Sequence, residues 1–595
     1  MRIDEAFLRG RGGWSRLPLA LALAAATGLA CGGGDAGGPR ETGTLALASG
    51  DAQSATVGTA LQPYRVLVTD PQGQPRPDVK VSWSVRSGGG TVSAGSSQSD
   101  AAGLAEITST LGTIAGAQVV QASIRGYSGS PVSFASTGTA GPPTGLVKLN
   151  GDNQTTSRSQ AVLIPPTVLV TDAYGNGVGG VTIAWAVQAG GGSVGAPSSV
   201  SGPSGAAAIG WTLGATPGTN LLDATLPGDT TVTFAALAVT AFSVDGGGNN
   251  VGERYTSDLW VADGYAYTGT WGFRGAFGNA VKIWQLDPGG APVLTDSIIT
   301  PGISTVSDLE VSPDGQWLVF TSEGGANRGI HAYELTSPGV AVSRATLPNS
   351  NGLHTGALAV IGGTLYAFAA QDPPGCALKV YDLSAAASGT ITVASSTPIP
   401  DHYCIHDTFV RDGYAFVFAW DEGLYIFDVG NGSHGGSPAN PVQVSKTGSP
   451  SNLRFGGETH NGWWFHNPVS GEQKYLFIGE EGPGAVGSSS SGDIHVVDVS
   501  DLANPVEVAS FHLAGAGTHN FWVDEPNQRL YAAYYNGGVV ALDISGVLSG
   551  NLSNRIVAQV RPGGNGNTYV WGVMLYHGAL YASDMLSGLW QLGLP

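Results

Sequence analysis

The stretch "CIHDTFVRDGYAFVFAWDEGLYIFDV", from Cys404 to Val429, shows the repeating unit of the C-terminal part of the chain. A His–Asp pair opens it, and an apolar strand, a short glycine turn, an aromatic strand, a loop and a further strand follow. Related stretches are "SDLWVADGYAYTG" (Ser257 to Gly269) and "HNFWVDEPNQRLYAAY" (His519 to Tyr534). A unit of about 40–50 residues with about four strands indicates the blade of a β-propeller.

The chain holds seven such units. Their inner strands are expected to begin near Ser257, Ser307, His354, His406, His460, His519 and Trp571. The last unit ends after three strands, so we expect "TAFSVDG" (Thr240 to Gly246) to supply its fourth strand and to close the ring. Closure removes exposed sheet edges. The sequence therefore predicts a seven-bladed propeller over residues 240–595.

Two stretches within these units resemble a known family. They are "IFDV" with "NPVQV" (Ile426 to Val444) and "VVDVSDLANPVEV" (Val496 to Val508), which look like the LVIVD-repeat family of bacterial surface propellers. The resemblance covers residues 252–595 and implies a propeller. It implies little about activity, because a fold does not settle a function.

A second repeat occupies the N-terminal part. "RVLVTDPQGQPRPDVKVSWSVRSGGGTVSA" (Arg65 to Ala94) matches "TVLVTDAYGNGVGGVTIAWAVQAGGGSVGA" (Thr167 to Ala196) without a gap, at an offset of 102 residues. Alternating strands broken by Asp-x-x-Gly turns predict one β-sandwich per copy, with Trp83 and Trp185 between the sheets. We expect these sandwiches over residues 43–140 and 141–239.

Both copies resemble bacterial Ig-like domains of group 1, the invasin and intimin type. The shared features are the "V-x-V-x-D-x-x-G" strand and turn, the "W-x-V" and "GGG" segment, and the closing "T-L-G". The resemblance implies a stiff stalk that carries a functional tip away from a membrane.

Composition agrees with an all-β fold: two tandem Ig-like sandwiches followed by a seven-bladed propeller. Glycine accounts for 92 of 595 residues, whereas charged residues make up only 12%. Such a chain suits short strands joined by tight turns, and no long stretch has the apolar spacing of a helix. The net charge is -19, without a basic stripe. We therefore expect no nucleic-acid partner.

The N-terminus carries an export signal. Arg9, Arg11 and Arg16 precede an uncharged stretch, Leu17 to Ala30, that is shorter than the about 20 residues needed to span a bilayer. The ending "GLAC" resembles a bacterial lipoprotein signal, although Gly28 stands where Leu is usual. The resemblance implies removal of residues 1–30, lipidation of Cys31 and a Gly-rich tether over residues 31–42. The protein would then be anchored in the cell envelope, at the outer membrane or cell surface. Export without a lipid is the alternative.

The other two cysteines are Cys376 and Cys404. Both fall in loops on the same face of the predicted propeller, in adjacent positions. A disulfide between them is expected, since the exported protein meets an oxidising compartment. Two free thiols are the alternative.

Four histidines recur at the start of inner strands: His354, His406, His460 and His519. They should form a ring around one mouth of the channel. One interpretation is structural, in which each His and the polar residue after it hold neighbouring blades. The other is a transition-metal centre, with Glu458 as a supporting residue. No ligand-spacing motif supports the metal.

The same mouth is expected to carry a set of aromatic and acidic residues: Trp420, Asp421, Glu422, Trp463 and Trp464. Such loops on a rigid scaffold suit recognition of a sugar, a peptide or a cationic ligand. Packing between blades is the alternative role for the tryptophans.

The sequence thus predicts an envelope lipoprotein whose propeller head binds a protein or glycan ligand on an Ig-like stalk. No nucleophile, general base or phosphate-binding loop stands out, so no catalytic residue is assigned. The alternative function is a metal-dependent enzyme that uses copper, iron or zinc on the histidine ring. No other cofactor is expected.

Overall fold

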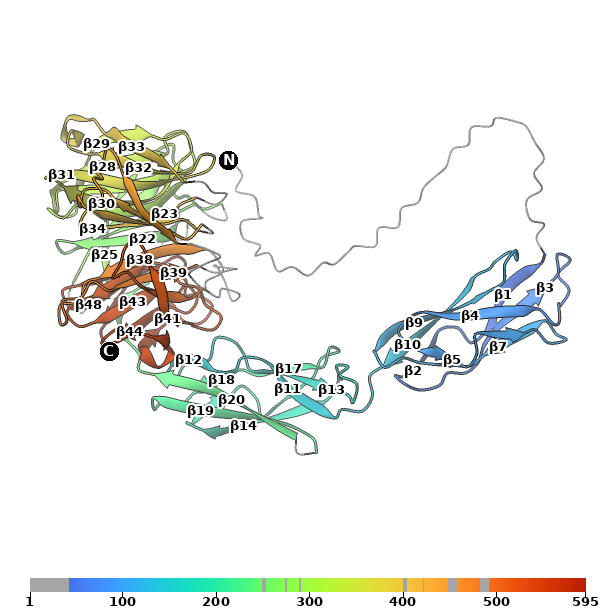
Figure 1. Ribbon diagram of the computed structural model, residues 1–595. Helices are drawn as coiled ribbons and strands as arrows, with labels where there is room; N and C mark the ends of the chain where they lie inside the picture. The colour runs from blue at the N-terminus through green and yellow to red at the C-terminus, as the bar shows by residue number, and fades with distance from the viewer. Residues whose placement is uncertain are drawn as a thin grey trace, which may run out of the picture.

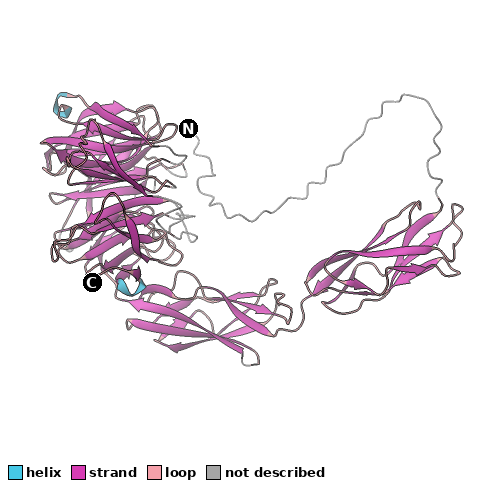
Figure 2. Ribbon diagram, in the orientation of Figure 1, coloured by secondary structure: helices cyan, strands magenta, loops and turns pink. Residues whose placement is uncertain are grey.

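The computed structural model describes residues 42–228, 230–248, 253–272, 275–287, 290–399, 404–420, 422–447, 458–481 and 492–595. Two β-sandwiches precede a propeller-like head (Figure 1), which confirms the predicted fold class. Within these ranges the helical segments are two 3-10 turns, Ala386–Ser388 and Ser553–Arg555 (Figure 2). No helix of the described ranges has the length and apolar character needed to cross a bilayer.

The first sandwich packs a three-stranded sheet on a five-stranded one. The smaller sheet contains β1 (Thr44–Ser49), β3 (Tyr64–Thr69) and β7 (Leu104–Ile107). The larger contains β2 (Gln53–Thr56), β10 (Val132–Thr139), β9 (Gly116–Ser123), β4 (Lys80–Ser87) and β6 (Ser96–Gln98), and β5 (Thr91–Val92) pairs with β8 (Ser109–Thr110). Buried Trp83 lies 5.8 Å from Phe134 between the sheets.

The second sandwich repeats this strand order. One sheet contains β11 (Gly145–Asn150), β13 (Thr167–Thr171) and β17 (Ala206–Ala208). The other contains β12 (Gln154–Ser157), β20 (Thr230–Val239), β19 (Gly218–Leu226), β14 (Thr182–Ala189) and β16 (Ser198–Val200), and β15 (Gly192–Val194) pairs with β18 (Trp211–Leu213). Trp185 donates its indole N–H to Ser199 Oγ at 2.8 Å, as Trp83 does to Ser97 Oγ at 2.9 Å. The sequence repeat is therefore a repeat of structure.

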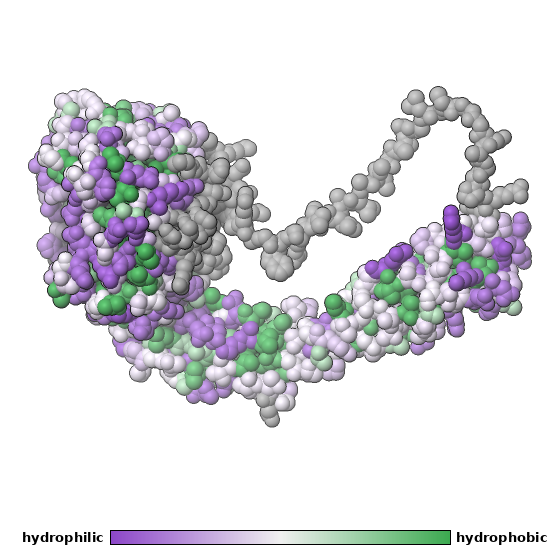
Figure 3. Space-filling view, in the orientation of Figure 1, coloured by the Kyte–Doolittle hydropathy of each residue, from purple (hydrophilic) through white to green (hydrophobic). Residues whose placement is uncertain are grey.

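The head consists of seven sheets, which are the blades of the propeller. Figure 3 shows the head as a compact body beside the slender sandwiches. Blade one contains β22 (Tyr255–Ala262), β23 (Tyr265–Trp271), β24 (Ala280–Gln285) and β25 (Val293–Ile299). Blade two contains β26 (Thr305–Val311), β27 (Trp317–Glu323), β28 (Gly329–Ser337) and β29 (Val340–Pro348). Blade three contains β30 (Leu353–Ile361), β31 (Thr364–Gln371), β32 (Ala377–Asp382) and β33 (Thr392–Pro398).

Blade four contains β34 (Asp407–Arg411), β35 (Tyr414–Phe418), β36 (Leu424–Asp428) and β37 (Val442–Thr447). Blade five contains β38 (Thr459–Phe465), β39 (Tyr475–Glu480), β40 (Ile494–Asp498), β41 (Val506–Phe511) and the short β45 (Gly550–Asn551). Blade six contains β42 (Phe521–Asp524), β43 (Arg529–Ala533), β44 (Val539–Asp543) and β46 (Ile556–Val560). Blade seven contains β47 (Val570–Tyr576), β48 (Ala579–Asp584), β49 (Gly588–Gly593) and β21 (Ser243–Gly247).

The ring of blades is closed. Each inner strand contacts the next one, from β22 through β26, β30, β34, β38 and β42 to β47, and β47 contacts β22 again. The closing contact joins the two ends of the head, because β21 pairs antiparallel with β49, with Ser243 opposite Gly593. This is the strand pairing predicted from "TAFSVDG". Leu589 and Leu592 of β49 are fully buried, so the last strand belongs to the core of the disc.

Side-chain hydrogen bonds join the two sandwiches. Asn176 donates through Nδ2 to Thr113 O at 2.8 Å and accepts from Ala115 N at 2.8 Å. Asp172, in the same turn, accepts from Gly141 N in the linker at 2.8 Å. A bent joint would break these three hydrogen bonds, so the contacts favour one relative orientation.

The second sandwich also packs on the head. Arg561 donates through Nη2 to Thr156 Oγ1 at 2.5 Å and to Ala161 O at 3.2 Å. Leu163 and Leu237 pack against the core between blades five and six. Burial at this contact lowers the pKa of Arg561 to about 10, and the guanidinium stays charged at neutral pH. The second sandwich and the head therefore form one continuous body.

We predict that Asn176→Ala loosens the joint between the sandwiches, because it removes both hydrogen bonds to the first one. Small-angle X-ray scattering should show a broader distribution of maximum dimensions than for the wild type. Gln74→Ala, in the exposed equivalent turn of the first sandwich, is the matched control and should leave the curve unchanged. Equal curves for Asn176→Ala and the wild type would contradict this description of the joint.

Candidate functional site at the channel mouth

Inner strands position the four histidines. His354 and His460 lie at the second positions of β30 and β38, and His406 and His519 lie shortly before β34 and β42. Because every inner strand begins at the same end of the channel, the four side chains meet at one mouth. His406, His460 and His519 are buried, with exposed fractions of 8%, 3% and 4%.

The imidazoles form part of a closed ring of aromatic side chains, called here the aromatic ring. Successive ring centroids lie 4.3 Å apart from His354 to His406, 5.0 Å from His406 to His460 and 4.1 Å from His460 to His519. Trp571 lies 4.5 Å beyond His519, and Trp271 lies 5.1 Å from Trp571 and 6.4 Å from His354. The histidines therefore surround one axis.

Two carboxylates lie against this ring. Glu481 Oε2 is 3.6 Å from His406 Nε2 and 3.7 Å from His460 Nε2, and its Oε1 accepts a hydrogen bond from the Tyr535 hydroxyl. Glu323 pairs with His354 Nδ1 and accepts from Ser307 Oγ at 3.1 Å. The first carboxylate lies between two imidazoles, whereas the second pairs with a single one.

Burial and neighbouring charges set the protonation of these groups. Burial, with the nearby histidines, holds the pKa of His406 and of His460 well below the usual value, and burial lowers the pKa of His519 to about 3. Burial would also lower the pKa of His354, but the Glu323 carboxylate raises it to about 9. Burial raises the pKa of Glu481 to about 7. At neutral pH, His406, His460 and His519 are therefore neutral, and His354 carries a positive charge.

A second polar layer lies along the channel below the aromatic ring. It consists of the residues one step further along the inner strands, Asp258, Asp308, Asp407, Asn461 and Asn520, and it lines a cavity of about 240 Å³. Asp308 accepts from Leu309 N and from Gly356 N of the next blade, both at 2.8 Å. Burial and the Asp308 charge raise the pKa of Asp258, Asp407 and Glu310 well above their usual values.

Hydrogen bonds between blades support the structural role of part of this repeat. Ser257 Oγ donates to Val306 O, and Thr355 Oγ1 donates to His406 O, both at 2.6 Å. The imidazoles differ from these groups. His460 Nδ1 is buried and has no hydrogen-bond partner among the described residues. Bridging of blades therefore explains the serine, threonine and aspartate positions better than the histidines.

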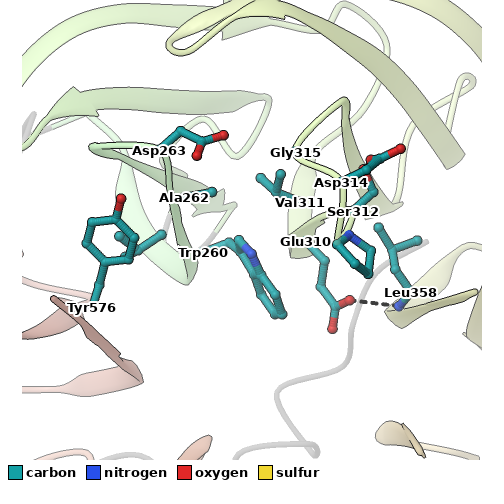
Figure 4. Close-up of a pocket in the computed structure, with 12 residues that line it drawn as sticks. Trp260, Ala262, Asp263, Glu310, Val311, Ser312, Asp314, Gly315, Leu358 and Tyr576 are labelled. Carbon is teal, nitrogen blue, oxygen red and sulfur yellow. Dashed lines mark hydrogen bonds between the residues drawn. The ribbon is translucent and has the colours of Figure 1, made fainter.

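The other mouth of the channel opens into a separate hollow of about 510 Å³, called here the far pocket (Figure 4). The ends of β22 and β26 line it with Asp263 and Asp314, and Tyr576 of blade seven lies beside them. Trp260 and Glu310 line both the far pocket and the channel cavity. Glu310 accepts a hydrogen bond from Leu358 N at 2.7 Å.

The predicted binding residues do not gather on one surface. Trp420 lies at the histidine mouth, 4.0 Å from the His406 ring, and Glu422 pairs with Lys446. Trp463 and Trp464 lie within β38 and not in a loop. Trp463 faces the channel cavity, and Trp464 packs between blades against Phe416.

Other predicted positions lie around the same strands or outside the described residues. Glu458 lies before β38, and its carbonyl accepts from Glu481 N at 3.0 Å. Cys376 and Cys404 form a disulfide with a Cα–Cα distance of 5.0 Å, within the usual range. Asp421 and Cys31 lie outside the described residues.

Sequence reasoning missed the residues that surround the imidazoles. Most of them stand at one place of the repeat, at or just after the end of the second strand of a blade, where the predicted Trp420 also lies: Trp271, Glu323, Asp372, Glu481 and Tyr535. Aligning the blades by the ends of their second strands, and not only by their first, would have revealed this set.

Comparison with known proteins gives matches to two parts of the chain. Residues 44–137 match the bacterial Ig-like domain (group 1), and residues 406–438 and 489–512 match the LVIVD repeat. No curated protein sequence matches. The chain therefore carries a bacterial Ig-like domain and LVIVD repeats, and function has to be argued from the site.

Solved structures with similarity to the chain include the D0-D1 domain of intimin, which is 22% identical with a TM-score of 0.15 over 32% of this chain and 94% of that chain. The β-propeller domain of Cps50 (Swd1) from Myceliophteria thermophila is 10% identical, with a TM-score of 0.41 over 60% of this chain and 99% of that one. Sqt1 of Saccharomyces cerevisiae is 9% identical, with a TM-score of 0.40 over 59% and 84%.

We predict that Asp308→Asn reduces the pH dependence of stability. Asp258 and Glu310 hold protons in the folded state that the unfolded chain releases above about pH 4, so the free energy of unfolding falls as pH rises. Removing the Asp308 charge lowers the pKa of both carboxyls. For each pKa unit by which one of them falls, the free energy of unfolding at high pH rises by about 1.4 kcal/mol. Urea unfolding at about pH 5 and about pH 8 measures the difference.

Asp296→Asn, on the exposed outer strand β25, is the control for this experiment. The amide nitrogen introduced by Asp308→Asn cannot accept the hydrogen bond from Gly356 N, so the free energy of unfolding can fall at every pH. The readout is therefore the change in the free energy of unfolding between the two pH values. If Asp308→Asn shows the same fall between the two pH values as the wild type, the carboxylates of the second layer do not interact as described.

Proposed function

We propose that the protein is an exported lipoprotein that holds its propeller head away from the membrane and binds a glycan or protein ligand. In this proposal Cys31 carries the lipid, residues 31–42 form the tether, and the two sandwiches are the stalk. The match of residues 44–137 to a bacterial Ig-like family supports a place in the bacterial cell envelope.

The orientation of the head on its stalk is the observation that carries the proposal. The second sandwich contacts the outer strand β46 of blade six and the adjoining part of the face on which the inner strands begin. Gly515, shortly before His519, lies so close to the sandwich that a Cβ there would come within 2.8 Å of Ile164. The far pocket lies where β22 and β26 end, on the opposite face. It therefore opens away from the stalk.

The lining of the far pocket suits recognition. Figure 4 shows the Asp263 and Asp314 carboxylates on opposite sides of the hollow, with the Trp260 indole between the strands that carry them. Aromatic faces pack against the apolar faces of sugars or against cationic side chains, and carboxylates accept hydrogen bonds from sugar hydroxyls or ammonium groups. Loops on a rigid scaffold are the usual place for such sites.

We predict that glycan and cell-surface protein arrays probed with the full chain identify a ligand whose binding depends on the far pocket. The double substitution Asp263→Asn and Asp314→Asn should weaken that binding about tenfold or more, because two charge-assisted hydrogen bonds are lost. Asp296→Asn is the control with the same change of charge type. A ligand that binds the double variant and the wild type equally would contradict the assignment of this pocket.

The anchor has a separate test. Cys31→Ser should move the protein from the membrane fraction to the soluble fraction of the exporting cell, because a serine cannot receive the thioether-linked lipid. Fractionation followed by immunoblotting measures the change. Arg40→Ser, in the adjoining segment, is the control. If the Cys31→Ser protein stays in the membrane fraction, another part of the chain holds it there.

A further inference from the structure

We propose that His406, His460 and Glu481 form a binding site for one divalent first-row transition-metal ion at the histidine mouth. The ligating atoms of these three residues lie within 4.8 Å of one another. Two imidazoles with one carboxylate are a donor set suited to zinc, iron(II), cobalt or copper. The site lies at the end of the channel opposite the far pocket and does not depend on the proposed recognition function.

The distances between the ligands fit an ion. Glu481 Oε2 lies 3.6 Å from His406 Nε2 and 3.7 Å from His460 Nε2. Both contacts exceed the length of a hydrogen bond. Ligands at about 2.1 Å from a tetrahedral ion stand about 3.4 Å apart, so these gaps are close to the edges of such a coordination shell. The two imidazole nitrogens lie within 4.8 Å of each other, so small inward movements of the three side chains would complete the geometry.

A hydrogen bond from Tyr535 orients the Glu481 carboxylate. The Tyr535 hydroxyl donates to Glu481 Oε1, which leaves Oε2 directed at the two imidazoles. Tyr535 is fully buried and lies 5.2 Å from the His519 ring. Metal-binding carboxylates are commonly oriented by such a hydrogen bond from a neighbouring residue. Tyr535 therefore acts as a positioning residue.

The second observation that points to an ion is the state of His460. It is only 3% exposed, and its Nδ1 has no hydrogen-bond partner among the described residues. Its Nε2 meets only the distant Glu481 oxygen among the ion-pair contacts of the ring. A buried imidazole that makes no close hydrogen bond is costly, and an ion bound at Nε2 would give the ring one strong interaction, while Nδ1 would keep none.

A neighbouring triad, Glu323, His354 and Asp372, also brings three ligating atoms together. It is the weaker candidate, because His354 Nδ1 already pairs with Glu323 and Glu323 also accepts from Ser307. One imidazole with two carboxylates is also a harder donor set, which suits transition metals less. The ion is therefore assigned to the triad around Glu481.

The test uses the full-length protein, freed of metal with a chelator and titrated with Co²⁺ alone and Zn²⁺ alone. Visible absorption of the bound Co²⁺ and calorimetry with Zn²⁺ measure stoichiometry and affinity. We expect one ion per chain. Glu481→Gln keeps the shape of the side chain but removes the anionic ligand, and it should weaken binding by about 100-fold or more. His460→Gln should have an effect of the same order.

Two further variants separate coordination from packing. His519→Gln changes an adjacent imidazole of the aromatic ring that lies outside the triad, so affinity should stay within a few-fold of the wild type. Tyr535→Phe should weaken binding about tenfold to 100-fold and shift the Co²⁺ absorption bands, because the carboxylate loses its orientation. A purely structural role for Tyr535 would lower the unfolding temperature without moving those bands.

Metal binding by the variants decides between a coordinating triad and a purely structural ring. Loss of one equivalent of Co²⁺ in Glu481→Gln, with retention in His519→Gln, supports the site. Absence of stoichiometric Co²⁺ and Zn²⁺ in the wild type overturns it, as does equal binding by the wild type and Glu481→Gln. Circular dichroism checks the fold, and if Glu481→Gln does not fold, His460→Gln and Tyr535→Phe decide by the same criteria. Failure of the far-pocket experiment leaves these results unaffected.

Discussion

The pairing of β21 with β49 is the constraint on which the head depends. It joins a strand from the start of the head to the last strand of the chain, with Ser243 opposite Gly593, and so turns a row of seven sheets into a ring. Only a ring makes all inner strands begin around one axis. Residues as distant in sequence as His354 and His519 thereby become part of one set of stacked side chains, which no local interaction could bring together.

The same closure gives the channel its chemistry. A narrow, protein-lined space strengthens electrostatic interactions, because water cannot screen them fully. The two layers respond in different ways: burial keeps His406 and His460 neutral by lowering each pKa, whereas the carboxyls of Asp258 and Glu310 hold protons beside Asp308. Neutral imidazoles are the form that ligates metals. The far pocket has exposed carboxylates instead, so the two ends of one channel offer different partners.

Much of this arrangement could be predicted from sequence, because it follows from repeats. The offset that relates Trp83 to Trp185 defines two like sandwiches, and the recurring His–Asp start defines the blades and the imidazole set. The carboxylate Glu481 could not be found in this way, since it follows the end of a second strand and lies between His460 of its own blade and His406 of the neighbouring blade. Trp463 and Trp464 were expected together at the mouth. Successive strand residues point to opposite sides, so one faces the channel and the other the interior between blades.

Ring closure should bring His406, His460 and Glu481 to one point that can hold an ion. Crystals of the protein grown with Zn²⁺, with diffraction recorded just above and just below the zinc absorption edge, test it most directly. We expect one strong anomalous peak per chain, within bonding distance of both imidazoles and the carboxylate. A head in which these three side chains lie apart, or a map with no peak between them, would contradict it.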